Sequence, residues 1–315
     1  MLENLLFAFG VTTPTFLIIV AGIVLKRIGL INNEFAQVGS ELAFKVALPC
    51  MLFTKLINVS FDNPPLLLIT YGLVATLLVF LLLELVIAPL LVQADRSTFV
   101  QASFRSNMGI VGLAFALNAY GDEILPLASV YLAIVTILFN VLSLVTLNRH
   151  LAMSGKEQRP LFFVLCRKIG TNPLIIAIVL ALLVSWWRVP VPGIVLGAME
   201  YLALMALPFA LLCCGAAIRW REFSVSVNLY WGTLAKLVLV PGLIVLGGIL
   251  IGLRAEELAV LFFMVSAPTA TASYPMVRSM GGNHYLAAAL IALTSLLSIV
   301  SVTVGLFLLR EFGLI

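Results

Sequence analysis

Long apolar runs follow one another almost from end to end of the chain, separated by short clusters of charged residues, glycine and proline. About 20 apolar residues in a helix cross a bilayer, and a helix satisfies all of its own backbone groups in lipid. The chain is 63% hydrophobic and 10% charged, whereas soluble domains average about 25% charged residues. We therefore predict an all-α integral membrane protein. The runs predict ten transmembrane helices, at residues 5–25, 36–58, 65–92, 97–119, 124–148, 161–187, 194–217, 224–253, 257–279 and 284–310.

The distribution of lysine and arginine predicts the orientation. Ten helices place both termini on one side, and the basic residues fall unequally on the alternating helix ends. One side holds Lys26, Arg27, Arg96, Arg149, Lys156, Arg159, Arg167, Lys168, Arg219, Arg221 and Arg278, and the other holds Lys55, Arg188, Arg254 and Arg310. The positive-inside rule assigns the richer side to the cytoplasm. We predict a multi-pass membrane protein with both termini outside.

The two halves of the chain resemble each other. Glu41–Leu52 reads ELAFKVALPCML and Glu200–Leu211 reads EYLALMALPFAL, at an offset of 159 residues. Further along, Gly121 aligns with Gly281 at an offset of 160. A nearly constant offset across several helices indicates an internal repeat.

This repeat divides the chain into a first five-helix unit at 1–148, a cytoplasmic loop at 149–160 and a second five-helix unit at 161–315. Because five is an odd number, the second unit enters the membrane from the opposite side. Inverted repeats of this kind are typical of secondary transporters, since their pseudo-symmetry provides inward-facing and outward-facing states.

The ninth predicted helix is interrupted at Ser266–Pro275, SAPTATASYP, where two prolines flank small hydroxyl residues. Proline removes a helical hydrogen bond and clashes with the preceding turn. The equivalent segment of the first unit is Ser106–Gly109, SNMG, where Gly109 and Gly112 can break the helix. We therefore predict that the fourth and ninth helices are both broken. Irregular backbone at membrane depth occurs where it is buried in protein or lines a cavity.

Four segments carry a resemblance to a known family: Leu48-Pro49, Arg105–Leu113, Ala267-Pro268 and Leu293–Ser298. With them, the whole chain resembles the auxin efflux carrier family, in its bacterial branch often described as malate or malonate permeases. The family usually has proline directly after the segment that ends at Leu113, and this chain has Ala114 there.

The resemblance implies the fold of sodium–bile acid symporters and sodium–proton antiporters, in which the fourth and ninth helices cross. It implies a scaffold of helices 1, 2, 6 and 7 that forms a homodimer, and a mobile core of helices 3–5 and 8–10 that moves like an elevator. It also implies transport of a small organic anion, a mono- or dicarboxylate such as auxin or malate.

The two breaks predict a substrate site. Asn107 and Pro268 lie ten and eleven residues inside their predicted helices, which at about 1.5 Å per residue places both near the middle of the bilayer. Two helix N-termini with unpaired N–H groups then face one cavity and favour a carboxylate. The predicted substrate-binding residues are Ser106, Asn107, Gly109, Pro268, Thr269, Thr271 and Ser273. For a single Ser or Thr the alternative is that it only satisfies backbone groups freed by the break, or lets helices pack closely.

Three ionisable residues, Lys45, Glu84 and Lys236, are predicted at the same depth, where a charge is costly and a functional role is the default hypothesis. We expect Glu84 and Lys236 to approach each other beside the crossing, with Glu84 either a proton carrier or half of a static ion pair. Lys45 either faces the substrate or turns toward the cytoplasm. Arg105 is expected to be shallower, reaching the inner surface or guarding the inward path.

Other functions are less well supported. The histidines, His150 and His284, lie in a loop and at a helix end, and no hydrolase or phosphate-binding motif is present, so we predict no enzyme. The cysteines lack metal-ligand spacing and the basic residues are scattered, so we predict no metal, no cofactor and no nucleic-acid partner. The alternatives are a sodium-coupled symporter of an amphipathic acid and a membrane receptor that does not transport. The coupling ion, proton or sodium, stays open.

Overall fold

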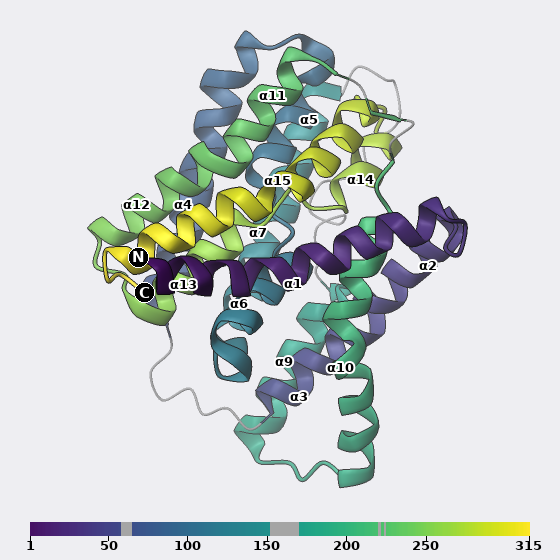
Figure 1. Ribbon diagram of the computed structural model, residues 1–315, viewed down its shortest axis with the longest axis vertical. Helices are drawn as coiled ribbons and strands as arrows, with labels where there is room; N and C mark the ends of the chain where they lie inside the picture. Colours follow the sequence, from purple (N-terminus) through teal and green to yellow (C-terminus); the bar gives the residue numbers. More distant parts are fainter. Residues whose placement is uncertain (58–64, 152–169, 220–221, 224) are drawn as a thin grey trace.

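The computed structural model of the protein describes residues 1–57, 65–151, 170–219, 222–223 and 225–315 (Figure 1). The regular elements of these residues are helices. Six helical stretches of this part of the chain are long and apolar enough to cross a membrane: Leu2–Arg27, Leu66–Leu90, Met108–Leu151, Gly193–Ala216, Val227–Leu250 and His284–Glu311. The prediction of an all-helical membrane protein is confirmed.

Most helix bounds lie within a few residues of the predicted ones. In the first half of the chain they are α1 (Leu2–Arg27), α2 (Asn33–Leu42), η1 (Ala43–Ala47), α3 (Leu48–Leu56), α4 (Leu66–Leu82), η2 (Leu83–Ile87), η3 (Ala88–Leu90), α5 (Gln93–Phe104), η4 (Met108–Gly112), α6 (Leu113–Tyr120), η5 (Gly121–Ile124) and α7 (Leu125–Leu151). In the second half they are α9 (Pro173–Trp187), α10 (Gly193–Ala216), α11 (Val227–Leu234), η7 (Ala235–Leu239), α12 (Val240–Leu250), α13 (Ala255–Ser266), α14 (Ser273–Ser279) and α15 (His284–Glu311). The helix predicted at 161–187 is an exception, because residues 171–172 are non-helical and α9 begins at Pro173, where Asn172 caps it and proline favours the first turn.

Some predictions fall outside the described residues. These are most of the loop predicted at 149–160 and the beginning of the helix predicted at 161–187. Five basic residues used for the orientation lie there as well: Lys156, Arg159, Arg167, Lys168 and Arg221.

Both helix breaks are present in the structure. α5 ends at Phe104, and the chain is non-helical at Arg105 and Asn107 before η4 and α6 continue. α13 ends at Ser266, and α14 begins only at Ser273. Proline and the small residues around it account for the second break, and the first break occurs although this helix has no proline.

Three membrane helices contain a π-helical turn that ends two residues before a proline. The turns are η1 before Pro49, η2 before Pro89 and η7 before Pro241. Proline has no N–H and its ring crowds the carbonyl four residues earlier, so the helix widens there by one residue. These turns carry Lys45, Glu84 and Lys236. A fourth such turn, η4, ends two residues before Ala114, where the family usually has proline.

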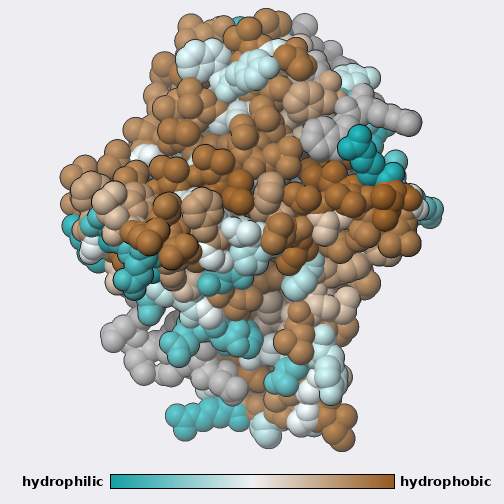
Figure 2. All heavy atoms as spheres, viewed as in Figure 1, coloured by the Kyte–Doolittle hydropathy of each residue, from teal (hydrophilic) through white to brown (hydrophobic). Residues whose placement is uncertain are grey.

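The helices form two groups joined by α1. In Figure 1, α2, α3, α9 and α10 gather at one end of the long axis, and α4, α5, α11, α12 and α15 gather at the other, with α1 running between them. α1 packs against α10 on one side and against α15 on the other. Apolar residues cover much of the visible surface, as expected for helices that face lipid (Figure 2).

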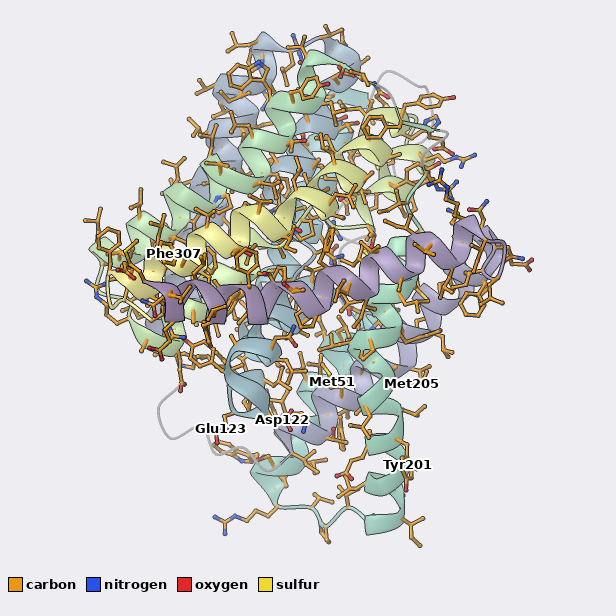
Figure 3. All side chains as sticks on the ribbon, in the orientation of Figure 1. Met51, Asp122, Glu123, Tyr201, Met205 and Phe307 are labelled. Atoms are coloured by element: carbon orange, nitrogen blue, oxygen red, sulfur yellow. The ribbon has the colours of Figure 1, made fainter. Side chains whose placement is uncertain are left out.

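Polar contacts hold several helix ends. The two chain termini lie beside each other (Figure 1), with the N-terminal amine 3.5 Å from Glu311, and elsewhere Lys55 pairs with Asp122, which Figure 3 labels. Lys26 donates to the carbonyls of Ala216 and Ile218.

Glycines allow α1 and α10 to approach closely. A Cβ at Gly215 would overlap the carbonyl of Ile19, and a Cβ at Gly22 would overlap the carbonyl of Leu212. Since the contacted atoms are backbone, neither helix can give way by turning a side chain. Small residues at such crossings let backbones pack closely in membranes.

We expect Gly215→Ala to lower the free energy of unfolding by about 1–3 kcal/mol, because the added methyl group overpacks this crossing. Thermal unfolding of the purified protein in detergent would measure the effect. Gly197→Ala is the matched control, because it lies on the same helix with nothing within 4 Å of a new Cβ. Equal unfolding temperatures for the two variants would contradict the role of Gly215.

Candidate functional site

The two broken helices are joined through their backbones. The Asn107 N–H donates to the Pro268 carbonyl at 2.8 Å, and the Ala270 N–H donates to the Arg105 carbonyl at 3.0 Å. The pairing is an antiparallel β-bridge between Ser106 and Thr269. Unwound backbone inside a membrane has no water to bind, so each segment satisfies groups that the other leaves open.

The hydroxyl groups at this crossing mostly bind backbone. Thr269 Oγ1 donates to the Ala102 carbonyl at 2.9 Å, and its N–H donates to Thr294 Oγ1 at 3.1 Å. Ser106 Oγ donates to the Val265 carbonyl at 3.1 Å. The hydroxyls of Ser106 and Thr269 therefore bind backbone groups that the helix breaks leave free, which is the alternative to a role in substrate binding.

The other predicted residues are placed differently. Ser273 begins α14, and its buried hydroxyl has no hydrogen-bond partner among the described residues. Thr271 is partly buried in the unwound segment. The Asn107 amide nitrogen lies 3.9 Å from Cys214 Sγ on α10. At Gly109, a Cβ would be in ordinary contact with Leu174 of α9. Asn107 and Gly109 therefore face the α9–α10 group.

Lys236 is fully buried and lies beside the crossing, as expected. Its ammonium donates to Ser106 Oγ at 2.5 Å and to the Val265 carbonyl at 3.1 Å. Val265 belongs to the last turn of α13, the negative end of that helix, which favours a cation. The ion pairs found among the described residues do not include Lys236.

The expected pair of Glu84 and Lys236 is not formed. Glu84 instead accepts from Thr146 Oγ1 at 2.7 Å, lies 2.8 Å from His150 Nε2 and pairs with Arg149 at 3.5 Å. His150 and Arg149 are in the last turn of α7, so Glu84 lies toward a helix end and not at the depth of the crossing. The expectation was wrong because two helices in equivalent places of the two halves need not turn their charged faces toward each other.

Lys45 does not reach the crossing either. Its ammonium lies 2.8 Å from the Glu41 carboxylate one turn earlier, and both side chains are exposed. Lys45 thus turns back along its own helix and does not face the crossing.

Arg105 is buried inside the protein and does not reach its surface. It directly precedes the bridge and is 8% exposed. Its guanidinium donates to Ser143 Oγ and Asn140 Oδ1 of α7, each at 2.9 Å, and contacts Met276 Sδ at 3.4 Å. The prediction that it reaches the surface was wrong. The sequence could have indicated this burial, because Arg105 directly precedes Ser106 and a residue next to a buried helix break is usually buried as well.

A polar cluster that was not predicted joins the loop after α10 to α14. The Tyr274 hydroxyl donates to Glu222 at 2.7 Å and accepts from Arg278 at 2.9 Å. The Arg219 guanidinium lies 4.6 Å from the centre of the Tyr274 ring. Burial raises the pKa of the Glu222 carboxyl, but the hydrogen bond from Tyr274 and the charge of Arg219 outweigh it and hold this pKa below its ordinary value. Glu222 therefore stays ionised at neutral pH.

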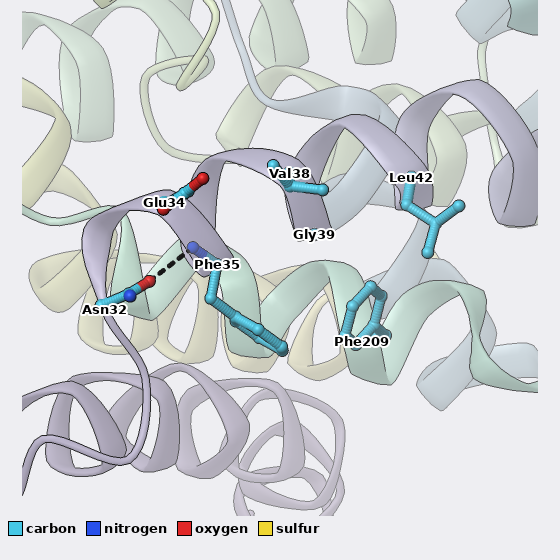
Figure 4. A pocket seen from close by; sticks show the side chains of 7 residues that line it. All are labelled: Asn32, Glu34, Phe35, Val38, Gly39, Leu42 and Phe209. Carbon is cyan, nitrogen blue, oxygen red and sulfur yellow. Dashed lines mark hydrogen bonds between the residues drawn. The ribbon is translucent and has the colours of Figure 1, made fainter.

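Two hollows on the surface of the described residues lie away from the crossing. One, shown in Figure 4, is lined by Asn32, Glu34, Phe35, Val38, Gly39, Leu42 and Phe209. A second lies between α1 and α10 and shares Phe209. Both are mainly apolar.

Comparison with known proteins decides the family. The sequence profile described as "Membrane transport protein" matches residues 7–306. The chain belongs to the membrane transport protein family. This confirms the resemblance to auxin efflux carriers. A protein of Rhizobium meliloti (strain 1021) named "Putative malonate transporter" is 28% identical over 232 residues, which cover 70% of this chain and 71% of that protein.

The bonding of Lys236 generates a prediction for this transport protein. We expect Lys236→Met to leave the thermal unfolding temperature unchanged or raised, because it removes a buried charge that has no carboxylate partner among the described residues. The hydrogen bond from Ser106 to Val265 remains in the variant. Thermal unfolding in detergent would measure this, and a clear fall in unfolding temperature would mean that the ammonium itself holds the crossing together.

Proposed function

We propose that this protein is a secondary transporter of a small organic anion, a mono- or dicarboxylate, in a bacterial inner membrane. The observation that carries the proposal is the crossing of two broken helices, joined by backbone hydrogen bonds and flanked by the buried cations Arg105 and Lys236. The membership in a transport family and the name of the Rhizobium relative agree with it. The anion binds beside the crossing, where Asn107 and Gly109 face the α9–α10 group.

Ten transmembrane helices in two inverted five-helix units are the topology we propose. Two features support it. The breaks at Arg105–Asn107 and between Ser266 and Ser273 lie about 160 residues apart, and each half has a helix in which a π turn with an ionisable residue precedes proline. The joint position of the termini agrees with an even number of crossings. In this topology both termini are periplasmic.

The transport cycle proposed here is elevator-type alternating access. The helices around the crossing form the moving core, and α1, α2, α3, α9 and α10 form the scaffold, through which two copies dimerise. The contact of Asn107 with Cys214 of α10 supports a moving crossing that slides along this scaffold. The cluster of Glu222, Tyr274 and Arg278 links the loop after α10 to the broken helix, and it has to separate when the core moves.

An anion fits this crossing better than a cation. The ammonium of Lys236 already occupies the Ser106 hydroxyl and the Val265 carbonyl, two oxygen atoms of the crossing that could otherwise bind a sodium ion. Groups of three or more His, Cys, Asp or Glu side chains that could hold a metal ion are absent from the described residues. The sodium-coupled symporter is therefore the second candidate.

Uptake by the purified protein in liposomes tests the function. We expect saturable accumulation of radiolabelled malonate or malate in protein-containing vesicles and none in empty vesicles. Each anion is measured with and without sodium and with and without a pH gradient. Strict dependence on sodium would favour the symporter. Binding of malonate to the detergent-solubilised protein without uptake would favour a receptor and contradict transport.

Glu84 is the proposed proton carrier, because it is buried yet bonded to residues in the last turn of α7. We expect Glu84→Gln to abolish the pH dependence of malonate uptake, since the amide cannot release a proton, while malonate binding is kept. Glu41→Gln is the control, because Glu41 is exposed and paired with Lys45. Uptake with unchanged pH dependence in Glu84→Gln would leave Glu84 as a static structural residue.

A further inference from the structure

Arg105 is a buried cation that has only neutral partners. Its guanidinium binds the Ser143 hydroxyl, the Asn140 amide oxygen and the Met276 sulfur. The ion pairs found among the described residues do not include it. An intramembrane arginine that no carboxylate neutralises is costly to bury, and such residues mark substrate pathways. The missing negative charge is then one that arrives with a ligand.

Two donors at this place are bound by a weak acceptor. Arg105 Nη1 and Gln101 Nε2 both point at Met276 Sδ, at 3.4 and 3.8 Å. A thioether sulfur accepts hydrogen bonds poorly, whereas a carboxylate matches the guanidinium fork with two parallel bonds. The Met side chain is flexible, so it can move aside when a stronger acceptor enters.

An unpartnered hydroxyl lies nearby. Ser273, one turn before Met276 on α14, is buried and its Oγ has no hydrogen-bond partner in the described part of the chain. Residues three apart on a helix lie on neighbouring parts of one face, so this hydroxyl and the Met276 sulfur project from the same side of α14.

The direction of the backbone separates Arg105 from Lys236. Arg105 is in extended conformation, and successive side chains of an extended chain point to opposite sides. Ser106 points to Lys236 and Val265. Arg105 therefore lies on the other side, where it binds α7 and Met276, and Asn107 faces α10.

We propose that Arg105 is the residue that binds the carboxylate of the transported anion, together with Asn107, while Lys236 lies on the opposite side of the crossing. Asn140 and Ser143 of α7 hold the guanidinium in place. In the absence of the anion, the Met276 sulfur occupies the position of a carboxylate oxygen. This inference rests on the proposed function and names the residue that recognises the charge of the substrate.

The sharpest test is Asn140→Asp, which places a carboxylate where the amide oxygen now accepts from Arg105 at 2.9 Å. The new side chain has the same shape and neutralises Arg105 inside the protein. We expect malonate to bind at least about tenfold more weakly, with an unfolding temperature equal to or above that of the unchanged protein. Asn32→Asp is the control, because this change adds the same charge while keeping the hydrogen bond that Asn32 accepts from the Phe35 N–H.

Arg105→Lys and Arg105→Gln complete the series. Lysine keeps the positive charge but cannot form the two parallel hydrogen bonds of a guanidinium. We therefore expect the Arg105→Lys variant to bind malonate more strongly than Arg105→Gln and more weakly than the wild-type protein. The dissociation constant of radiolabelled malonate and the unfolding temperature are measured for every variant in detergent. If Arg105→Gln does not fold, Asn140→Asp decides.

The outcomes distinguish failure of the role of Arg105 from failure of the proposed transport function. Malonate binding that is unchanged in Asn140→Asp overturns the role of Arg105 and leaves the proposed function standing. Binding lost together with thermal stability in Asn140→Asp also overturns it, because Arg105 would then hold helices together. If the unchanged protein binds none of malonate, malate and acetate, the proposed function fails and this inference fails with it.

Discussion

Two backbone hydrogen bonds, from Asn107 to Pro268 and from Ala270 to Arg105, are the constraint on which the rest of the site depends. Lipid offers no partner to an unwound backbone, so each broken helix needs the other to be broken at the same depth. This mutual dependence brings the two halves of the chain together at one point. It also exposes side chains of both segments to the helices around them, in directions that an unbroken helix would not allow. The hydroxyls of Ser106 and Thr269, the first candidates for a substrate, are used to stabilise this junction.

Proline shapes this membrane protein in two distinct ways. At Pro268 it contributes to ending a helix, and at Pro49, Pro89 and Pro241 it opens a π turn within a helix that continues. Each of these turns carries an ionisable residue, and a widened turn changes the direction of its side chains. The direction differs from case to case, so the three charges meet different partners. η4 has the same widened turn without proline, next to the crossing and to Gly109 and Gly112. The broken helix formed by α5, η4 and α6 therefore has no proline to fix its backbone.

The predicted site was partly right for reasons that can be named. Lys236 was placed at the crossing from its depth, and depth along a helix follows from counting residues. The partners of Glu84 and Lys45 were not predictable in this way, because a count says nothing of the direction in which a helix faces. Glu84 binds the end of α7, and Lys45 binds its own helix. Arg105 was misplaced because its depth was counted along an unbroken helix, whereas extended backbone at the break turns it toward α7.

The sequence by itself determined the membrane class, the helix bounds and the positions of both breaks, because hydrophobic length, proline and glycine act locally. The family also followed from the sequence, through segments at the breaks. Only the tertiary structure decided which side chains meet there. It joined the two breaks into one bridge, directed Lys236 and Arg105 to opposite sides of it, and left Arg105 with neutral partners. These contacts depend on the rotation and packing of helices far apart in the chain, where apolar faces of similar composition leave several arrangements open and the matching of buried polar groups selects one.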